Sequence, residues 1–169
     1  AGQLIKKLNI EFDVYFTSVQ IRAIDTLEII LDILNKKNSE IKKAWELNER
    51  HYGALTGLNK DEMMKKLGKK QVHIFRRSWN VPPPTMKKTH PNHPSKNKTY
   101  INIPTDKMPD SESLKNTFER VMPYYKKNIK PLLSSNKNIL IAAHGNSLRA
   151  LCKKLLNISN KKIIDFEIP

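Results

Sequence analysis

Acidic, basic and phenolic side chains are concentrated in residues 47–60, which contain two glycines and show no periodic apolar face. The candidate site residues in this segment are Glu49, Arg50, His51, Tyr52 and Lys60. Carboxylate and imidazole groups can transfer protons, while guanidinium and ammonium groups can bind phosphate. The segment therefore predicts part of a ligand site. For Glu49 taken alone, the sequence favours a structural ion pair over a proton-transfer role.

A second group of polar residues follows the apolar run of residues 139–143. The run ends at His144, and Gly145 and Asn146 come next. In open α/β sheets, ligands bind at the carboxyl ends of strands, where the first amides of a following helix favour anions. The pattern predicts a buried strand that places these residues at a phosphoryl-transfer site. A histidine that only hydrogen-bonds a neighbouring loop is an equally open alternative.

Three arginines are candidates for anion binding. Arg22 follows the first predicted strand, and Arg76 and Arg77 are adjacent near the end of a predicted helix. Two guanidinium forks side by side suit bidentate binding of a phosphate or carboxylate. Adjacent arginines also occur on solvated helix faces, so the tandem pair alone does not decide between the two interpretations.

Strand-like and helix-like segments alternate along the chain. Apolar residues at Ile21, Ile24, Leu27 and Leu31 recur every three or four positions and predict a helix after a strand over residues 12–16. Further segments are expected as a strand over 41–47, helices over 59–67, 71–79 and 111–120, a proline-rich loop over 80–109 and a strand from Ile139. Pro123 is expected to kink or divide the helix that contains it.

This order predicts a single α/β domain over residues 1–169. Its three layers would be a mostly parallel central sheet with helices on both faces. The lone Cys152 lies on an apolar helical pattern and is expected to be a buried, reduced thiol. No apolar run reaches the roughly 18 residues that a membrane helix needs. We therefore expect a cytoplasmic protein without a membrane partner.

The formal net charge of +15 raises the possibility of nucleic-acid binding. The lysines, however, occur as dispersed pairs, aromatic residues make up only 7% of the chain, and no nucleic-acid motif is present. We therefore expect no nucleic-acid partner. A strongly positive protein would instead attract small polyanions such as sugar phosphates.

The chain resembles the cofactor-dependent phosphoglycerate mutases of the histidine phosphatase superfamily. The resemblance extends over essentially all 169 residues. It is carried by Phe16-Thr17-Ser18-Val19 with Arg22-Ala23, the block 47–60, Arg76-Arg77-Ser78 with Pro82-Pro83, Ser111-Glu112-Ser113-Leu114, and Ala142-Ala143-His144-Gly145-Asn146-Ser147-Leu148-Arg149.

The resemblance implies the phosphoglycerate mutase-like fold and an isomerase of glycolysis and gluconeogenesis. It would interconvert 3-phosphoglycerate and 2-phosphoglycerate through a phosphohistidine, primed by 2,3-bisphosphoglycerate and without a metal. Its partners would be small phosphorylated three-carbon acids and further copies of itself, as a dimer or tetramer. The implied catalytic residues are Glu49, the general acid/base, and His144, which stabilises the transferring phosphoryl group. The implied substrate- and phosphate-binding residues are Arg22, Arg50, His51, Tyr52, Lys60, Arg76, Arg77, Gly145 and Asn146.

One family feature is absent from the sequence. The family's nucleophile lies in an Arg-His-Gly segment at the end of its first strand, and the chain contains no such segment. We expect residues 1–169 to lack that strand and a further C-terminal strand. A polypeptide that begins at Ala1 is then expected to show no mutase turnover and to expose apolar surface. The alternatives are a bisphosphoglycerate mutase or phosphatase relative, a catalytically dead fragment, or a basic binding module.

Overall fold

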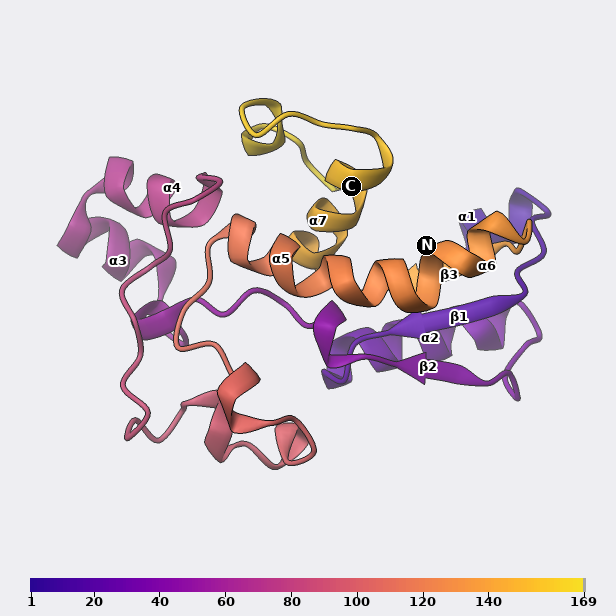
Figure 1. Cartoon of the computed structure of the whole chain (residues 1–169), viewed down its shortest axis with the longest axis horizontal. Coiled ribbons are helices and arrows are strands. Elements are labelled where there is room, and N and C mark those ends of the chain that lie inside the picture. Colours follow the sequence, from indigo (N-terminus) through magenta and orange to yellow (C-terminus); the bar gives the residue numbers. More distant parts are fainter. Residues whose placement is uncertain (169) are drawn as a thin grey trace. The chain divides into compact units, whose positions relative to one another are not determined.

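The computed structural model describes residues 1–168, apart from the side chain of Lys60. The chain divides into two compact units (Figure 1). Unit 1 comprises Ala1–Asn48 and Pro123–His144, and unit 2 comprises Glu49–Met122 and Gly145–Pro169. The expectation of one domain over residues 1–169 stays a prediction.

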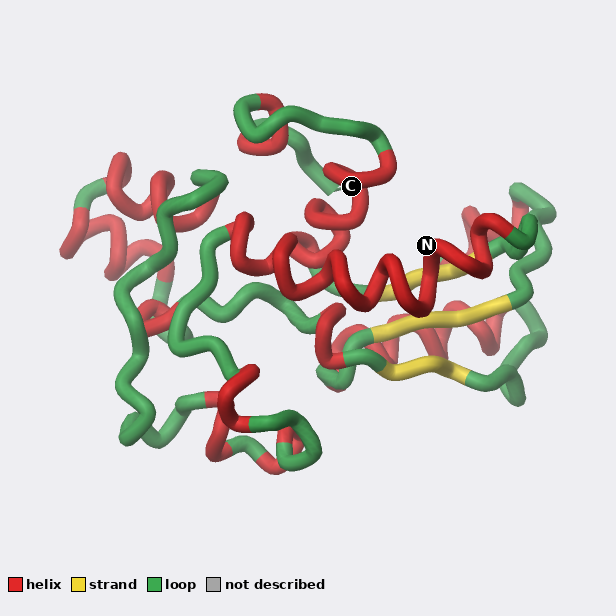
Figure 2. Tube along the Cα trace, in the orientation of Figure 1, coloured by secondary structure: helices red, strands yellow, loops and turns green. Residues whose placement is uncertain are grey.

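Unit 1 contains a three-stranded parallel sheet, drawn in yellow in Figure 2. Its strands are β1 (Val14–Thr17), β2 (Ile41–Lys43) and β3 (Ile139–Ala142), in the order β2-β1-β3. Tyr15 of β1 is aligned with Ile41 on one side and with Leu140 on the other. Because the strands are parallel, their carboxyl ends lie at one edge of the sheet. The predicted parallel sheet is confirmed.

Helices cover both faces of this sheet (Figure 1). Alternate residues of β1 point to opposite faces, so Tyr15 packs with Leu27 and Leu31 of α2 (Ile21–Ile33). On the other face, the ring of Phe16 meets Tyr124 edge to face with centroids 6.2 Å apart. Helix α1 (Gly2–Lys7) packs against α2. The predicted three-layer arrangement is therefore confirmed.

Two elements differ from the prediction. Strand β2 ends at Lys43, and Trp45–Leu47 forms a 3₁₀ helix where the strand was expected to continue. The helix predicted over residues 111–120 also differs at its end, because α5 (Leu114–Tyr124) extends past Arg120 and contains Pro123. A π-helix, Tyr125–Ile129, then separates α5 from α6 (Lys130–Ser134), so the helix is divided near Pro123, as expected. Proline removes one backbone donor, and a π turn is a common way for a helix to absorb such a local irregularity.

The described part of unit 2 is built from helices and loops without a strand (Figure 2). Helix α3 (Lys60–Leu67) begins where expected, since the side chain of Asn59 accepts a hydrogen bond from the Asp61 amide at 2.8 Å. Gly68, with φ +79°, joins it to α4 (Lys69–Arg77). Helix α7 (Gly145–Leu155) follows His144 directly.

The predicted long loop, 80–109, contains only three short 3₁₀ turns. Buried residues anchor it, among them Met86, whose amide donates to the Asp110 carbonyl at 2.9 Å. The loop also contacts Gly53, whose φ is +56° and where any side chain would clash with the Pro84 carbonyl oxygen. Glycine therefore permits the close approach of this loop to the 47–60 segment.

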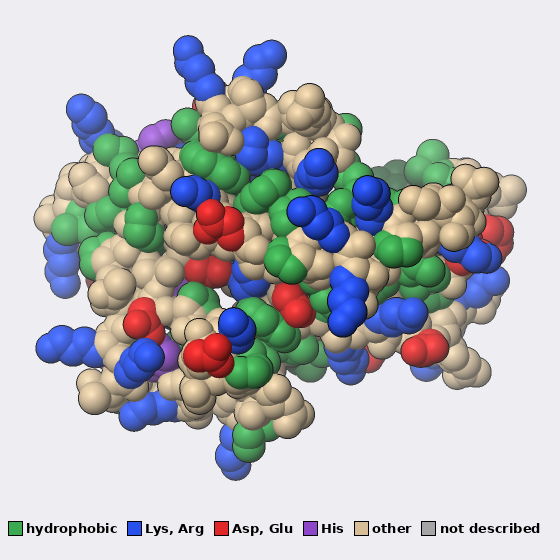
Figure 3. All heavy atoms as spheres, in the orientation of Figure 1, with side chains coloured by type: hydrophobic (Ala, Val, Ile, Leu, Met, Phe, Trp, Pro, Cys, Tyr) green, Lys and Arg blue, Asp and Glu red, His purple; other side chains and the backbone are tan. Residues whose placement is uncertain are grey.

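Basic side chains are dispersed over one face of the structure. Figure 3 shows Lys and Arg spread singly over the face in view, with Asp and Glu among them. In the part of the chain that the structure describes, no helix combines the length and apolar character required to cross a membrane.

Candidate active site

In unit 1, His144 lies just beyond the end of β3 and is only 6% exposed. Its Nε2 is 2.8 Å from the Ser18 hydroxyl oxygen, and its Nδ1 is 3.3 Å from an Arg22 guanidinium nitrogen. Ser18 directly follows β1, and Arg22 lies in the first turn of α2. The parallel pairing of β1 with β3 thus brings together two segments that are 126 residues apart.

The partners of His144 define its tautomer. A guanidinium group can only donate hydrogen bonds, so Nδ1 must accept from Arg22. The ring proton is then on Nε2, which donates to Ser18 Oγ. This arrangement requires a neutral imidazole, and it leaves the exposed Arg22 as the cation of the group. Such a group suits an anion such as a phosphoryl oxygen.

Two further residues shape the loop after β1. The N-cap of α2 is Gln20, and no side chain caps the helix. Ser18 Oγ is instead bonded to His144 and accepts from the Gln20 amide at 3.1 Å. Asn48, which the sequence did not indicate, accepts from the Val19 amide at 3.1 Å.

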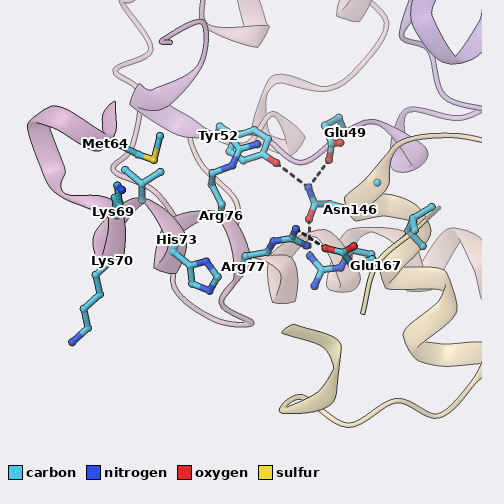
Figure 4. Close-up of a pocket in the computed structure, with 14 residues that line it drawn as sticks. Glu49, Tyr52, Met64, Lys69, Lys70, His73, Arg76, Arg77, Asn146 and Glu167 are labelled. Carbon is cyan, nitrogen blue, oxygen red and sulfur yellow. Dashed lines mark hydrogen bonds and ion pairs between the residues drawn. The ribbon is translucent and has the colours of Figure 1, made fainter. Parts of the chain in front are cut away.

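In unit 2, Asn146 connects two candidate site residues (Figure 4). Its amide nitrogen donates to the Glu49 carboxylate at 2.9 Å and to the Tyr52 hydroxyl at 3.1 Å. Its amide oxygen accepts from Arg149 at 3.4 Å. These partners fix the orientation of the amide, because only its nitrogen can donate. Glu49 Oε1 also accepts from the Arg50 backbone amide at 2.7 Å.

Glu49, Tyr52, Asn146 and Arg149 line a cavity of about 860 Å³. Helix α4 contributes four further basic residues to the lining, Lys69, Lys70, Arg76 and Arg77, of which the two arginines are its last residues. In Figure 4, His73 lies beside Arg77, and Lys70 points away from Asn146. Arg77 pairs with Glu167 at 3.1 Å, and both side chains are partly exposed. An anion that binds Arg77 must therefore compete with a solvent-screened carboxylate.

Arg50 is buried, 2% exposed, and does not line the cavity. One guanidinium nitrogen donates to the backbone carbonyls of Phe75 and Arg76, each at 3.1 Å. The guanidinium carbon lies 4.6 Å from the centroid of the Tyr52 ring, and that of Arg76 lies 5.4 Å from the same centroid. Arg50 thus contacts residues of the cavity wall from behind.

His51 also lies outside the cavity lining. Its backbone amide donates to Glu112 at 2.9 Å, and its Nδ1 accepts from the Gly53 amide at 3.2 Å. Burial lowers the pKa of His51, an effect that the nearby Glu112 carboxylate partly opposes. Glu112 is itself buried and receives two hydrogen bonds from Arg120, at 2.7 and 2.9 Å.

Arg149 was not predicted as a site residue. It is 5% exposed and donates to the carbonyls of Ile163 and Ile164 as well as to Asn146. Burial lowers the pKa of its guanidinium, with further lowering from Arg77 and Arg50. The available signal was its spacing, because Arg149 lies three residues after Asn146 and therefore on the same side of α7.

Comparison with known proteins identifies the family. Residues 1–91 and 84–169 match the model of the histidine phosphatase superfamily (branch 1). Over all 169 residues, the chain is 52% identical to the 2,3-bisphosphoglycerate-dependent phosphoglycerate mutase of Pelagibacter ubique and covers 71% of it. The chain belongs to this mutase family. It is also 47% identical, over its full length, to the mutase of the same name from Actinobacillus pleuropneumoniae, of which it covers 74%.

Solved structures show the same fold. The structure of mycobacterial glucosyl-3-phosphoglycerate phosphatase matches 98% of the chain and 67% of its own length, with a TM-score of 0.66. Because sequence identity is only 15%, this likeness concerns the fold alone. The phosphoglycerate mutase-like α/β fold expected from the sequence is thereby confirmed.

The structure groups the mutase candidate residues into two sets. Arg22 and His144 are in contact in unit 1. The candidates that line the cavity of unit 2 are Glu49, Tyr52, Arg76, Arg77, Gly145 and Asn146. Arg50 and His51 lie outside that lining, and the side chain of Lys60 is outside the described residues. The residues described include no group of three or more His, Cys, Asp or Glu that could hold a metal ion.

Proposed function

We propose that this chain interconverts 3-phosphoglycerate and 2-phosphoglycerate in glycolysis and gluconeogenesis, as part of a 2,3-bisphosphoglycerate-dependent mutase. The supporting observation is the cavity of unit 2, where the Glu49 carboxylate shares one lining with the guanidinium groups of Arg76 and Arg77. This combination matches the substrates, which carry both anionic groups and a hydroxyl proton that must move. The substrate class agrees with the names of the relatives.

In this proposal, Arg76 and Arg77 bind the substrate's carboxylate or phosphate through bidentate hydrogen bonds. Glu49 takes up and returns the proton of the substrate hydroxyl. Asn146 holds both Glu49 and Tyr52 through its amide nitrogen, so it sets the position of the carboxylate. A fixed carboxylate needs little rearrangement before proton transfer.

The residues of unit 1 act on the phosphoryl group. A dissociating phosphoryl group carries negative charge on its oxygens, and positioned cations and hydrogen-bond donors stabilise that charge. Arg22 is the cation for this role. Its hydrogen bond to His144 Nδ1 limits the orientations of the guanidinium group.

The phosphohistidine of the proposed reaction is not assigned to any histidine of these 169 residues, because none lies in an Arg-His-Gly segment. Bound 2,3-bisphosphoglycerate would supply the phosphoryl group that primes the enzyme. The proposal includes no metal. Assembly into a dimer or tetramer and a cytoplasmic location remain predictions.

The function is tested by measuring conversion of 3-phosphoglycerate to 2-phosphoglycerate by the complete polypeptide that contains this sequence. We expect conversion that depends on catalytic amounts of 2,3-bisphosphoglycerate, and its absence would contradict the proposal. Faster release of phosphate from 2,3-bisphosphoglycerate, or faster synthesis of it from 1,3-bisphosphoglycerate, would instead assign the chain to those reactions. A polypeptide restricted to residues 1–169 should bind 3-phosphoglycerate without turnover.

The Arg76→Lys variant tests how the substrate is bound. Lysine keeps the charge but loses the planar fork, so the affinity for 3-phosphoglycerate should fall by about tenfold. Isothermal titration calorimetry of wild type and variant measures this change. Unchanged affinity would show that Arg76 provides only charge.

A further inference from the structure

Arg149 is a buried arginine to which the proposed reaction assigns no role. It lies on α7 three residues after Asn146, is only 5% exposed and belongs to the lining of the cavity in unit 2. Its Nε is buried without a hydrogen-bond partner. A buried donor that is left unsatisfied costs stability, so a stabilising role alone does not account for a long cation at this position. The partners of its two terminal nitrogens indicate another role.

The two terminal nitrogens of Arg149 have different partners. Nη2 donates to the backbone carbonyls of Ile163 and Ile164. Nη1 donates to the amide oxygen of Asn146 at 3.4 Å. The donors of an arginine form a rigid planar fork, so the carbonyl bonds at one nitrogen limit the orientation of the whole group. The other nitrogen is thereby directed at the Asn146 oxygen.

The Asn146 amide could adopt two orientations, and only one of them gives Glu49 a hydrogen-bond donor. In the structure its nitrogen donates to the Glu49 carboxylate at 2.9 Å and to the Tyr52 hydroxyl at 3.1 Å (Figure 4). If the amide turned over, its oxygen would face the carboxylate, and two acceptors cannot bond to each other. A donor at the amide oxygen excludes this second orientation, because the NH₂ group that would take its place cannot accept. Arg149 is that donor.

We infer that Arg149 is a positioning residue of the proposed mutase reaction, which fixes the orientation of the Asn146 amide and thereby the Glu49 carboxylate without contacting the substrate. This inference rests on the proposed function. At 3.4 Å the bond to Asn146 is longer than most N–H···O bonds, so its loss should affect the position of the amide more than the stability of the fold. A proton-transfer carboxylate that is no longer held in place lowers kcat rather than substrate affinity.

The Arg149→Lys variant separates the two sets of contacts. An ammonium group keeps the charge and can donate to the carbonyls, but it has no second nitrogen for Asn146. Steady-state kinetics of the complete polypeptide that contains this sequence should show a kcat for 3-phosphoglycerate that is lower by about tenfold, with KM changed by less than about twofold. A raised KM with unchanged kcat would mean that Arg149 binds the substrate, and wild-type values of both would mean that its role is structural. Either result would overturn the inference.

A double-mutant cycle tests whether the effect passes through Asn146. In the Asn146→Ala background, Arg149→Lys should lower kcat by less than about twofold, because residues that act through one another are not additive. An equal loss of kcat in the wild-type and Asn146→Ala backgrounds would show that Arg149 acts by another route and would overturn the inference.

NMR with selectively labelled asparagine provides a measurement that does not depend on turnover. Nuclear Overhauser contacts between the Asn146 side-chain NH₂ protons and the Tyr52 ring should be present in the wild-type protein and weakened in Arg149→Lys. Unchanged contacts would overturn the inference. If the wild-type polypeptide does not convert 3-phosphoglycerate, the proposed function fails, while these contacts still show whether Arg149 orients the amide.

The matched control is Arg120→Lys. Arg120 is another largely buried arginine of unit 2, but it pairs with Glu112 and is not among the residues that line the cavity. We expect this variant to lower the midpoint of urea unfolding, yet to leave kcat within about twofold of wild type. An equal loss of kcat in Arg120→Lys and Arg149→Lys would assign the effect to general stability and overturn the inference.

Discussion

In unit 1 the polar side chains come from the ends of two neighbouring parallel strands, whereas in unit 2 they come from a segment without regular structure and from helix ends. Ser18 and His144 meet because β1 and β3 are paired. Glu49 and Tyr52 are held instead by an amide from α7. A sheet positions the groups at its edge through backbone pairing, while a loop-built site needs side chains to hold it.

The two units also differ in their buried charged side chains. Among the described residues, the buried arginine and glutamate side chains all lie in unit 2: Arg50, Glu112 and Arg149. Each donates to or accepts from a segment distant in the sequence. Removing one partner of a buried ionic contact is strongly destabilising, because a charge is left without compensation. We therefore expect the site of unit 2 to be more sensitive to single substitutions than that of unit 1.

The largest expected effect is on turnover. In the complete mutase, Glu49→Gln keeps the shape of the side chain but removes proton transfer, so kcat should fall by about 10²–10⁴-fold, with a smaller change in KM. Steady-state kinetics with 3-phosphoglycerate measures both. The control is Glu119→Gln, an exposed carboxylate of α5, which should leave kcat unchanged. Equal kcat in wild type and Glu49→Gln would assign Glu49 a hydrogen-bonding role only.

The next effect is on stability. Glu112→Gln leaves Arg120 buried without its carboxylate and weakens the bond from the His51 amide, so unfolding free energy should fall by about 3–5 kcal/mol. The comparison in unit 1 is Asp32→Asn, which removes an exposed ion pair with Lys37 and should cost under about 1 kcal/mol. Urea unfolding of both variants measures these two losses of unfolding free energy. Similar losses would contradict the expected difference between the units.

A smaller loss is expected from Ser18→Ala. This variant removes the acceptor for His144 Nε2–H and should lower the unfolding free energy, measured by urea unfolding, by about 1 kcal/mol.

The tautomer of His144 can be checked separately. Nitrogen NMR of the ring should show the Nε2–H tautomer in the wild-type protein, as the hydrogen bond from Arg22 requires. An Nδ1–H tautomer would contradict the assignment of this site.

The last contrast between the units is in how their stability depends on pH. Burial lowers the pKa of His51 from its ordinary 6.5. As the pH falls, the imidazole is therefore protonated in the unfolded chain at a higher pH than in the folded chain. The stability contributed by neutral His51 is therefore complete above about pH 6.5 and is lost as the pH falls through the folded value. The pKa of Asp13 is lowered from 3.8, chiefly by the Asn138 backbone hydrogen bond and then by Lys137, so its contribution is lost only below that pH.

Acidification from pH 7.5 to 4.5 should consequently lower the protection factors of amides around His51 before it lowers those of the Asp13 region of unit 1. Hydrogen exchange at several pH values measures this order. His51→Asn, which keeps an acceptor for the Gly53 amide, should remove the early response. The reverse order would show that other groups govern the acid sensitivity of unit 2.

Much of unit 1 could be predicted because its signals are local. The apolar spacing around Leu27 and Leu31 identified α2, and the apolar run before His144 identified β3. In unit 2 the helix predicted over 59–67 also rested on local signals and is confirmed, with Asn59 as its N-cap. The extension of α5 beyond Arg120 to Tyr124 was missed, because tertiary context outweighed the local preference of Pro123 against a helix interior.

The sequence by itself determined the chemical groups, the main strands and helices, and the family to which the motifs belong. Only the tertiary structure decided which groups face the cavity and which support it. Arg50 and Arg76 have the same side chain, yet one lies under a helix end and the other lines the cavity. The physical reason is that the burial and hydrogen bonding of a long cation depend on carbonyls from a segment 25 or more residues away, which no local pattern encodes.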